Sequence, residues 1–471
     1  MLLCTVALSA YSITDGYFGN RVYGFDSRSF GLGNTGVFDE LRPFGISNNP
    51  ANLTLMRKSF GLQGGLNLTR NEDTRLVPLY NSFDNYIDDA VYASNINAYD
   101  DYAGLAFATK KMLWLRSGIA VYHKPLISYD GNFEEQIRNN RNTDNDVYPE
   151  AIARNSIENE GLLNQLGIAM SIGVEVGDDI TVNLGHDYSF LEGKITEQRS
   201  IRWTDWARNT VTTANPAYVL PDSTFTQKTE LSGHQFKFGA AVKINQRFGF
   251  GLVYVPKAKL DRSGSFIAIR DSSRLSNEIV QTGDIDELYI LPAEYRIGIN
   301  YQPRNVMRTW FNLDAEFVRW SDVNKYFEDA VNFYAGVEHH VQNRLPLRLG
   351  FQSVSTWRFD LEKDVQTVNG QQVITDVYIT KRTITPMITG GSSIQLTKGL
   401  NLDLGFGYSW REYEALDLFR DTYYNDKLYT GQSSYLLWPN QYINLKDRNW
   451  DNPDKIRENF INFNTSISYT W

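Results

Sequence analysis

Charged side chains recur at alternate positions within apolar segments, where they could bind a ligand carboxylate or one another. Lys237, Arg296 and Arg348 supply cations, and Asp314 and Glu316 supply carboxylates. Adjacent residues of a strand point to opposite faces, so these charges would share one polar face. A guanidinium binds a carboxylate through parallel hydrogen bonds, whether that carboxylate belongs to protein or ligand. The pattern predicts an enclosed charge network or a ligand-carboxylate site, with these further members: Arg116, Arg411, Glu175, Asp187, Glu294, Glu338 and Asp403.

Histidine, serine and acidic residues suggest no further site. The five histidines lack the spacing of metal ligands, and the adjacent His339 and His340 would point to opposite faces of a strand. No serine can be assigned to His186 as a catalytic partner, so we expect neither an enzyme nor a bound metal. Acidic loop segments at residues 88–89 and 144–146 could bind Ca²⁺, although solvated loop charge is the simpler interpretation.

Three glycines match the spacing of a dinucleotide-binding loop. They are Gly31, Gly33 and Gly36. No apolar strand precedes them and no βαβ unit follows, both of which that fingerprint requires. We therefore expect no cofactor and assign these glycines to turns.

The elements that must position the charged residues are the strands of a membrane barrel. Residues 460–471 alternate between mainly apolar or aromatic residues and small polar residues, and end on Trp471. Aromatic residues make up 14% of the chain although its mean hydropathy is polar. A lipid-facing aromatic girdle around a wet lumen requires this mixture. After the first dozen residues, no segment has the roughly 18 apolar residues of a membrane helix. The sequence predicts an all-β, transmembrane, antiparallel barrel.

Turn signals divide the chain into about fourteen strands, a number within the range of membrane barrels. Short turns on the periplasmic side and long loops outside would place both termini in the periplasm. Within residues 235–244, alternation directs Gln235 and Lys237 to the lumen, and Phe236 and Phe238 to lipid. The short turns are predicted near residues 110–113, 177–179, 245–247, 303–307, 341–344 and 397–400. The long loops are predicted over residues 70–101, 124–163, 198–227, 262–286, 354–380 and 412–456.

The amino-terminal residues differ from the strands. Residues 1–10 resemble a secretory signal, because an apolar stretch there ends in a small-x-small pattern. The single cysteine, Cys4, lies within it, so a processed chain would have no disulfide. Residues 29–53 lack a period of two, and we expect residues 11–57 to fold into the lumen as a plug, while residues 58–471 form the barrel. The net charge of −9 argues against nucleic-acid binding.

The aperiodic segment carries the motifs of a known family. Residues 31–36 read GLGNTG, and residues 49–53 read NPANL. Residues 310–321 form an expected strand that ends in Trp320-Ser321. These motifs resemble the amino-terminal hatch and one strand of the FadL/TodX family of outer-membrane transport proteins, which includes PorV-like relatives.

The resemblance implies a fourteen-stranded barrel blocked by a hatch, through which hydrophobic molecules such as long-chain fatty acids pass. It places the protein in the outer membrane of a Gram-negative cell, as a monomer surrounded by outer-membrane lipids. Barrel assembly machinery would bind the strand that ends at Trp471. Pro292 and Pro386 fall within expected strands, where each either opens the wall or marks a strand end. The hatch and its gating would rest on Gly31, Gly33, Gly36, Asn49, Pro50, Ala51 and Asn52, with Pro50 fixing its own φ and Asn49 capping the next turn.

Two classes of function stay open. The first is a transporter for a hydrophobic ligand or lipid, which should line the space above the hatch with apolar residues and one cation. The second is a PorV-like barrel that escorts proteins for a type IX-like secretion machine and has no small-molecule cargo. Such an escort should present an ordered protein-binding surface. A porin-like structural protein is disfavoured by the hatch. Aromatic residues in the expected loops suit either class: Trp203, Trp206, Phe225, Trp357, Phe359, Tyr423, Tyr424, Tyr435 and Trp438.

Overall fold

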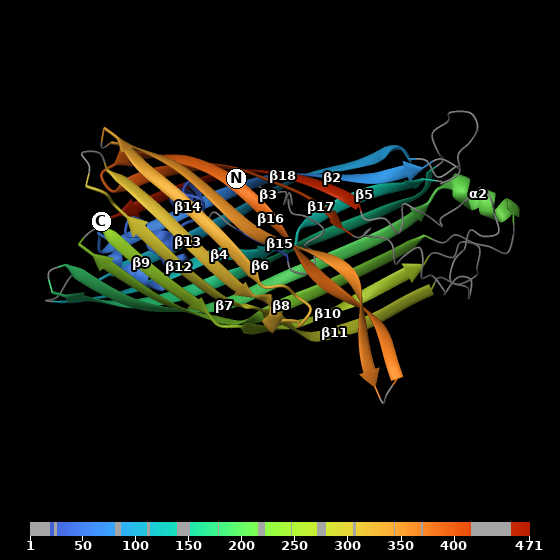
Figure 1. The fold of residues 1–471 in the computed structure, drawn as a ribbon, viewed down its shortest axis with the longest axis horizontal. Coiled ribbons are helices and arrows are strands. Elements are labelled where there is room, and N and C mark those ends of the chain that lie inside the picture. Colours follow the sequence, from blue (N-terminus) through green and yellow to red (C-terminus); the bar gives the residue numbers. More distant parts are fainter. Residues whose placement is uncertain are drawn as a thin grey trace, which may run out of the picture.

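A computed structural model describes thirteen stretches of the chain. They are residues 19–22, 26–80, 86–110, 114–138, 151–177, 179–214, 222–245, 247–270, 279–304, 308–342, 344–368, 371–415 and 454–471. Most of these residues lie in strands (Figure 1). The wall strands are β2 (Phe60–Tyr80), β3 (Tyr86–Ala108), β4 (Leu115–Ser128), β5 (Gly131–Arg138), β6 (Ala151–Val176), β7 (Ile180–Trp203), β8 (Ser223–Ile244), β9 (Phe248–Val255), β10 (Ala258–Arg270), β11 (Ile279–Leu291), β12 (Ala293–Tyr301), β13 (Thr309–Arg319), β14 (Ala330–Val341), β15 (Leu345–Val368), β16 (Gln371–Thr397), β17 (Leu400–Ala415) and β18 (Asp454–Thr470).

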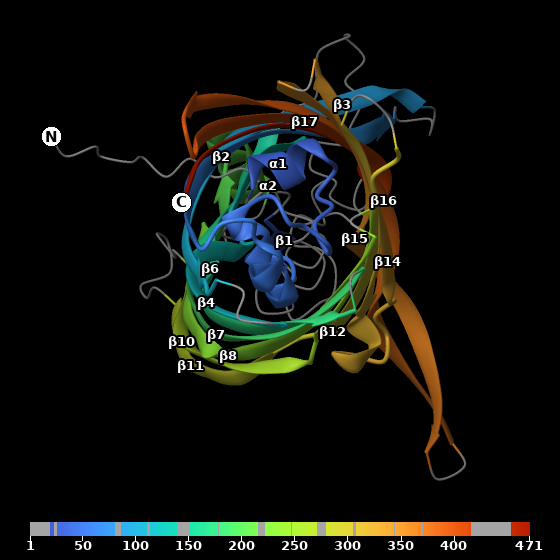
Figure 2. The same cartoon turned by 90° about the vertical axis from the view of Figure 1, so that its left-hand side faces the viewer.

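The wall strands pair antiparallel around a closed barrel. The last strand, β18, pairs with the first, β2, so the sheet has no terminal edge at this junction. Three wall strands are each interrupted once, as β4/β5, β9/β10 and β11/β12, which leaves fourteen wall strands in the described part of the chain. The prediction of an antiparallel fourteen-stranded barrel is confirmed. Figure 2 looks into this barrel from the end that carries the short turns.

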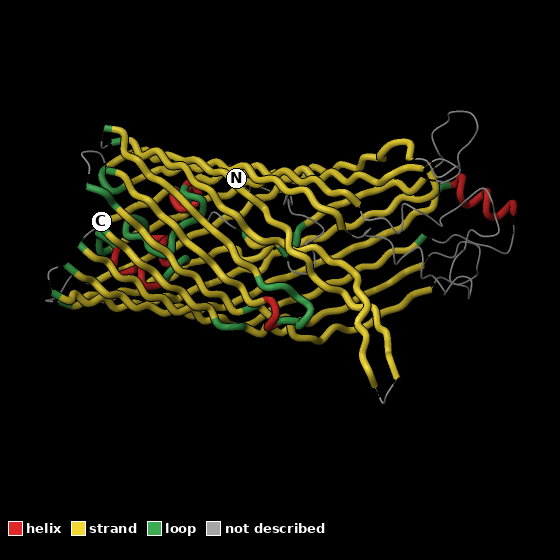
Figure 3. Tube along the Cα trace, in the orientation of Figure 1, coloured by secondary structure: helices red, strands yellow, loops and turns green. Residues whose placement is uncertain are grey.

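Helical turns occupy three places. A short strand and three helical turns lie inside the barrel, η4 (Trp320–Asp322) lies in the wall, and α2 (Asp205–Ala214) lies at the end opposite the short turns (Figure 3). No helix of the described residues is long and apolar enough to cross a membrane. The elements inside are β1 (Asn20–Arg21), α1 (Ser27–Gly31), η2 (Pro43–Ser47) and η3 (Pro50–Leu55).

The outer face of the wall carries an apolar band of membrane height. In β7, Ile180, Leu184 and Phe190 point outward and are exposed. The roughly ten residues between Ile180 and Phe190 span about 33 Å of strand, or about 25 Å along the axis at a tilt of ~40°, the usual height of a lipid-facing band. Beyond this band the outer face is polar, as in the exposed pair of Lys194 with Glu230, whose charged atoms lie 2.7 Å apart.

The inner face carries the polar residues, as the alternation predicts. Phe236 and Phe238 are 48% and 47% exposed, whereas Gln235 and Lys237 between and beside them are buried. This confirms the inward and outward sets predicted for residues 235–244. The buried charged residues of the wall include Asp187, Asp314, Glu316, Glu338, Arg348, Asp403 and Arg411.

Four of the predicted long loops consist mostly of strand, which corrects the sequence analysis; they are residues 70–101, 124–163, 262–286 and 354–380. All six predicted loop ranges contain ordered strand, and β15 and β16, for example, are separated only by residues 369–370. Beyond the membrane both faces of a strand can contact water, so polar residues replace the alternating pattern from which strands were recognised. The backbone ladder continues there without that pattern, and the barrel therefore extends well beyond the apolar band.

Residues 26–56, called the inner segment below, pack inside the barrel (Figure 2). Asp26 caps α1, because its carboxylate accepts a hydrogen bond from the Ser29 amide at 3.1 Å. The side chain of Asn49 caps η3 by accepting from the Ala51 amide at 3.0 Å, while Pro50 occupies the first helical position. α1 contacts β15 to β18, and η3 contacts β6, β7 and β8, so the segment touches opposite parts of the wall.

The two prolines noted in the sequence behave differently. Pro292 separates β11 from β12, since it cannot donate to a ladder. Pro386 remains inside β16, opposite Ser353, and β16 pairs with β17 only from Met387 onward. Beyond these residues β15 and β16 pair with each other alone among the described strands, and their hairpin projects away from the barrel (Figure 1).

Candidate functional site

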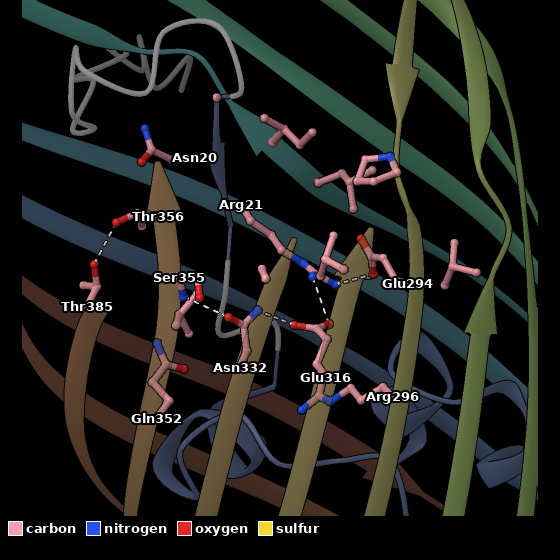
Figure 4. A pocket seen from close by; sticks show the side chains of 18 of the residues that line it. Asn20, Arg21, Glu294, Arg296, Glu316, Asn332, Gln352, Ser355, Thr356 and Thr385 are labelled. Atoms are coloured by element: carbon pink, nitrogen blue, oxygen red, sulfur yellow. Dashed lines mark hydrogen bonds and ion pairs between the residues drawn. The ribbon is translucent and has the colours of Figure 1, made fainter. Parts of the chain in front are cut away.

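A large cavity lies inside the barrel, bounded on one side by the inner segment. Together with the solvent-filled space into which it opens, it measures about 1750 Å³. Its lining comes from β1, from the inner segment and from strands all around the wall (Figure 4). A concave space lined by many elements within a closed wall is the kind of place where small organic ligands bind.

One side of the cavity is apolar. Leu126 and Ile127 of β4, Val253 and Val255 of β9, and Leu291 of β11 line it. Ile127 and Leu291 belong to a larger apolar cluster on the inner wall, which also contains Leu163, Leu191, Leu231 and Leu260. Transfer of apolar surface from water to such a lining is favourable, so this side suits a hydrophobic ligand.

Arg21 of β1 crosses the cavity to two wall carboxylates. Its guanidinium lies 3.0 Å from Glu294 and 2.9 Å from Glu316 (Figure 4). β3 pairs with β4 only as far as His123. Beyond that residue, β1 pairs with β4 at Ile127 and Ser128. Arg21 therefore joins β4 to β12 and β13, on another part of the wall.

Arg296 and Asp314 form the contact that the sequence predicts among the inward charges. Their charged atoms lie 3.1 Å apart. Asp314 also accepts hydrogen bonds from the amides of Gly36 and Val37, at 2.8 and 3.1 Å, and Arg296 donates to the Asn34 carbonyl at 2.5 Å. This pair thus holds the inner segment to the wall.

Glu316 does not join that pair directly. Beyond Arg21, its second oxygen accepts from the Asn332 amide at 2.9 Å and from the Tyr334 hydroxyl at 2.7 Å. All of these partners are protein groups, so in this arrangement Glu316 positions β1 and braces β13 against β14.

Arg348 pairs elsewhere than with Asp314 or Glu316. It lies 2.7 Å from Glu338 and 3.0 Å from Asp403, and its side chain is 1% exposed. Each of these carboxylates also binds an arginine of the inner segment: Arg28 lies 2.8 Å from Glu338, and Arg42 lies 2.8 Å from Asp403. The result is a buried, alternating chain of charges between wall and inner segment.

Burial inside the barrel and neighbouring charges shift the pKa values of charged groups in the inner segment. Burial by itself would lower the pKa of Arg28, but the carboxylates of Asp39 and Glu338 outweigh it and raise that pKa. Burial also raises the pKa of Asp26, with a further contribution from Asp39. Arg28 therefore stays charged at any physiological pH.

Lys237 lines the cavity and binds the inner segment. Its ammonium group donates to the Ser47 carbonyl at 2.6 Å. Nearer the short-turn end, Glu40 forms ion pairs with Lys243 of β8 and with Arg57, the latter at 2.7 Å. Burial would raise the pKa of Glu40, but Lys243 and Arg57 outweigh it and lower that pKa.

The hatch residues expected from the resemblance lie at tight contacts within the inner segment. Gly33 has φ +67°, and a Cβ there would lie 2.5 Å from the Phe351 carbonyl oxygen. The Asn49 amide donates to the carbonyls of Val37 at 2.7 Å and Ala240 at 3.1 Å. Asn52 donates to the carbonyls of Gly36 and Gly45, each at 3.1 Å. Gly31, Pro50 and Ala51 are buried beside them.

Sequence reasoning missed two sets of residues. The first is Arg21, Arg28 and Arg42, whose clustering ahead of the first wall strand was the available signal. The second is a set of wall glycines that receive the inner segment: a Cβ at Gly251 would lie 2.5 Å from the Val37 carbonyl, and one at Gly405 would lie 2.8 Å from the Phe30 ring. Glycine at inward positions of a strand was the signal for this close approach.

Several expectations lie outside the described residues. They concern the signal-like residues 1–10, the acidic residues 144–146, and the aromatic residues Tyr423, Tyr424, Tyr435 and Trp438. Among described residues, no group of three or more His, Cys, Asp or Glu could hold a metal ion.

Comparison with known proteins identifies the fold. No protein-family model and no curated protein matches the chain. Among solved structures, the chain is similar to a FadL homologue from Pseudomonas aeruginosa, at 12% identity and a TM-score of 0.59 over 96% of this chain and 99% of that one. It is also similar to the P. putida toluene transporter TodX (14%, 0.57, 96% and 99%) and to the Ralstonia pickettii toluene transporter TbuX (14%, 0.53, 95% and 98%). The chain therefore has the fold of the FadL/TodX-like barrels.

Proposed function

We propose that this protein is an outer-membrane channel that takes up hydrophobic small molecules, such as long-chain fatty acids, through a barrel gated by the inner segment. The observation that carries the proposal is the cavity, which combines an apolar side with several cations. Leu126, Val253 and Leu291 would receive an alkyl chain. Lys124, Lys237 and Arg21 line the same cavity and would attract a carboxylate.

The inner segment would act as the hatch. It is fastened to the wall by buried ion pairs and by the asparagines Asn49 and Asn52, which favours one closed shape. A ligand shifts such an element only through its higher affinity for the open form. Ligand in the cavity would supply that difference by competing for Arg21 or Lys237, the cations that hold β1 and Ser47 in place.

The protein-escort alternative is favoured by one observation. The hairpin of β15 and β16 leaves the wall and projects outward (Figure 2), where it would offer a surface to another protein. The cavity has no role in that function. The two proposals therefore differ in whether apolar ligands bind inside the barrel.

Binding and uptake of a long-chain fatty acid test the proposal. Val255→Asp places a charge on the apolar side of the cavity, and Val365→Asp makes the same change on the exposed hairpin. We expect only Val255→Asp to abolish binding in lipid nanodiscs and uptake by cells that have no fatty acid channel of their own. If the unmodified protein binds no fatty acid, and cells with and without it take up fatty acid at the same rate, the channel proposal is wrong. The protein-escort proposal is then favoured.

A further inference from the structure

The short-turn end of the barrel carries far more positive than negative charge. We define the rim as the strand connections at this end and the residues that lead into β2: residues 56–59, 109–114, 177–179, 245–247, 302–308, 342–344 and 398–399. The rim sequence contains two carboxylates, Asp178 and Asp179, and nine cations: Arg57, Lys58, Lys110, Lys111, Arg247, Arg304, Arg308, Arg344 and Lys398. Its net charge is therefore +7. Because the whole chain carries −9, the remaining residues carry −16.

Charges next to the rim do not reverse this balance. Within three residues of the rim, the strands add two cations and one carboxylate, namely Arg116, Lys243 and Glu175. The inner segment adds Glu40, which forms ion pairs with Arg57 and Lys243. The terminal carboxylate of Trp471 lies at this end as well. With all of these groups included, cations at the short-turn end still outnumber carboxylates by about two to one.

Outward aromatic rings place the rim at the membrane surface. The rings of Phe248 and Tyr301 lie 4.8 Å apart on the outer face, and the exposed ring of Trp471 lies at the same end. Such rings mark the boundary between the hydrocarbon and the polar region of a membrane. Arg247 directly precedes Phe248, and Arg304 follows Tyr301 by three residues. At a strand tilt of ~40°, three residues advance about 8 Å along the axis, so the rim cations lie at the level of lipid headgroups.

The rim cations encircle the barrel. Every rim segment contains at least one cation except residues 177–179, which join β6 to β7 and contain both aspartates. The rim cations that the structure describes are exposed or half-exposed. The strand connections that carry them are short and form one end of the wall (Figure 2). A soluble acidic protein would contact one part of this end, whereas lipids surround all of it. The encircling arrangement therefore favours anionic lipid headgroups as the partner.

Three exposed arginines form the densest part of the rim. Arg304 and Arg308 belong to the connection of β12 to β13, and Arg344 belongs to that of β14 to β15. The His340 amide donates to the Arg308 carbonyl at 2.9 Å, and the Arg344 amide donates to the Val341 carbonyl at 3.0 Å. These bonds bring the two connections side by side. We call Arg304, Arg308 and Arg344 the arginine cluster.

We propose that the rim binds anionic phospholipids in the membrane leaflet at this end of the barrel, most strongly at the arginine cluster. A guanidinium donates parallel hydrogen bonds to phosphate oxygens, and a lysine ammonium acts on them as a point charge. The alkyl stems of both side chains lie along the apolar girdle while their charged ends reach the headgroups. Zwitterionic lipids carry a compensating cation beside the phosphate, so the rim selects lipids by their net charge. The inference requires a barrel in a membrane and does not depend on transport of any ligand.

Fluorescence quenching by spin-labelled lipids tests the inference. Leu345→Cys places a thiol on the outer face beside the arginine cluster, and Ile180→Cys places one beside the acidic residues 177–179. Both are made with Cys4→Ser and labelled with a fluorophore. The vesicles consist of phosphatidylcholine with a small fraction of spin-labelled phosphatidylglycerol or spin-labelled phosphatidylcholine in both leaflets, so the orientation of the barrel does not matter. The measured quantity is the ratio of quenching by phosphatidylglycerol to quenching by phosphatidylcholine.

The two positions should differ in this ratio. We expect a ratio of roughly three or more at Leu345→Cys, because several cations there attract the anionic lipid. The ratio at Ile180→Cys should be less than half as large. High salt should lower the ratio at Leu345→Cys, since it screens exposed charges. Equal ratios at the two positions would overturn the inference.

A matched pair of triple variants identifies the charges responsible. Changing all three arginines of the cluster to Gln should bring the ratio at Leu345→Cys close to one. The control removes three exposed cations from the outer face beyond the opposite side of the membrane, through Lys194→Gln, Lys228→Gln and Lys259→Gln, and should leave the ratio unchanged. A ratio that the arginine variant does not lower would overturn the inference. If that variant does not fold, the comparison of the two labelled positions decides.

An acidic soluble partner predicts a different result. In that case the ratio at Leu345→Cys would lie near one, and added polyglutamate would change the fluorescence of the label. This outcome would also overturn the inference. None of these measurements involves fatty acid uptake, so they can fail while the proposed function stands.

Discussion

Replacing Arg348 by Met removes the guanidinium that joins two buried carboxylates. In the structure Arg348 binds Glu338 and Asp403, and it also donates to the Ser392 carbonyl at 3.2 Å. Met has a similar length and no charge. Both carboxylates would remain buried, each with a single arginine of the inner segment.

The loss in stability follows from that arrangement. Removing one partner of a buried ion pair costs about 3–5 kcal/mol, because the other charge stays buried. Arg28 and Arg42 still neutralise the two carboxylates, so we expect about 2–4 kcal/mol for Arg348→Met. The matched control is Arg457→Met, which breaks an exposed pair with Glu412 at 3.4 Å and should cost no more than about 1 kcal/mol.

Urea unfolding of the protein in lipid vesicles, followed by the gel mobility of folded and unfolded barrel, measures both changes. Leakage of a small polar dye from the same vesicles reports whether the inner segment has loosened. Arg348→Met should show lower stability and greater leakage than Arg457→Met. Equal stability losses in the two variants would refute the role assigned to the buried charge chain.

Three further outcomes are expected. Gly33→Ala should destabilise the barrel by about 1–3 kcal/mol, whereas Gly177→Ala, at the same φ of +67° but with open space around it, should cost only the backbone strain of roughly 1 kcal/mol; equal urea midpoints would contradict this. Because the folded pKa of Glu40 is lowered, the stabilisation from its pairs with Lys243 and Arg57 is complete above the unfolded pKa and is lost as pH falls through the folded pKa. Dye leakage should therefore rise only in strong acid, and this acid-induced rise should be absent in Glu40→Gln. Leakage that begins near neutral pH would contradict the prediction. Deleting residues 29–53 should leave a closed barrel that leaks polar dyes and has altered fatty acid uptake, and unchanged rates for both would refute the hatch.

The wall was predictable from the sequence because a period of two governs any strand with lipid on one face. Phe236 and Lys237 fall on opposite faces for that reason alone. The same rule failed beyond the membrane, where β2 and β3 continue through residues 70–80 and 86–101 although both of their faces can be wet. Backbone pairing does not require alternation, so its loss did not mark the strand ends.

The sequence predicted which charged residues face the lumen but not how they pair. Alternation identified Arg296, Asp314 and Arg348 as inward charges, but it could not choose among partners that lie far apart in the chain. Arg348 pairs with Asp403 because β15, β16 and β17 are neighbours, which only the register shows. The role of Arg21 was equally hidden, since it depends on a short strand that pairs with β4 on the inner side of the wall.

The contacts of the inner segment constrain how the barrel can be assembled. α1 packs against β15 to β18, near the end of the chain, whereas η3 packs against β6 to β8, nearer its beginning. The inner segment packs directly against the backbone at wall glycines such as Gly251 and Gly405. It cannot shift along the wall, because other positions on the wall carry larger side chains. If the barrel closes first, the inner segment must enter the lumen already folded. If the inner segment is in place from the start, the wall strands can assemble around it until β18 pairs with β2. In the second case, β18 can pair with β2 only after the inner segment has packed correctly inside the barrel.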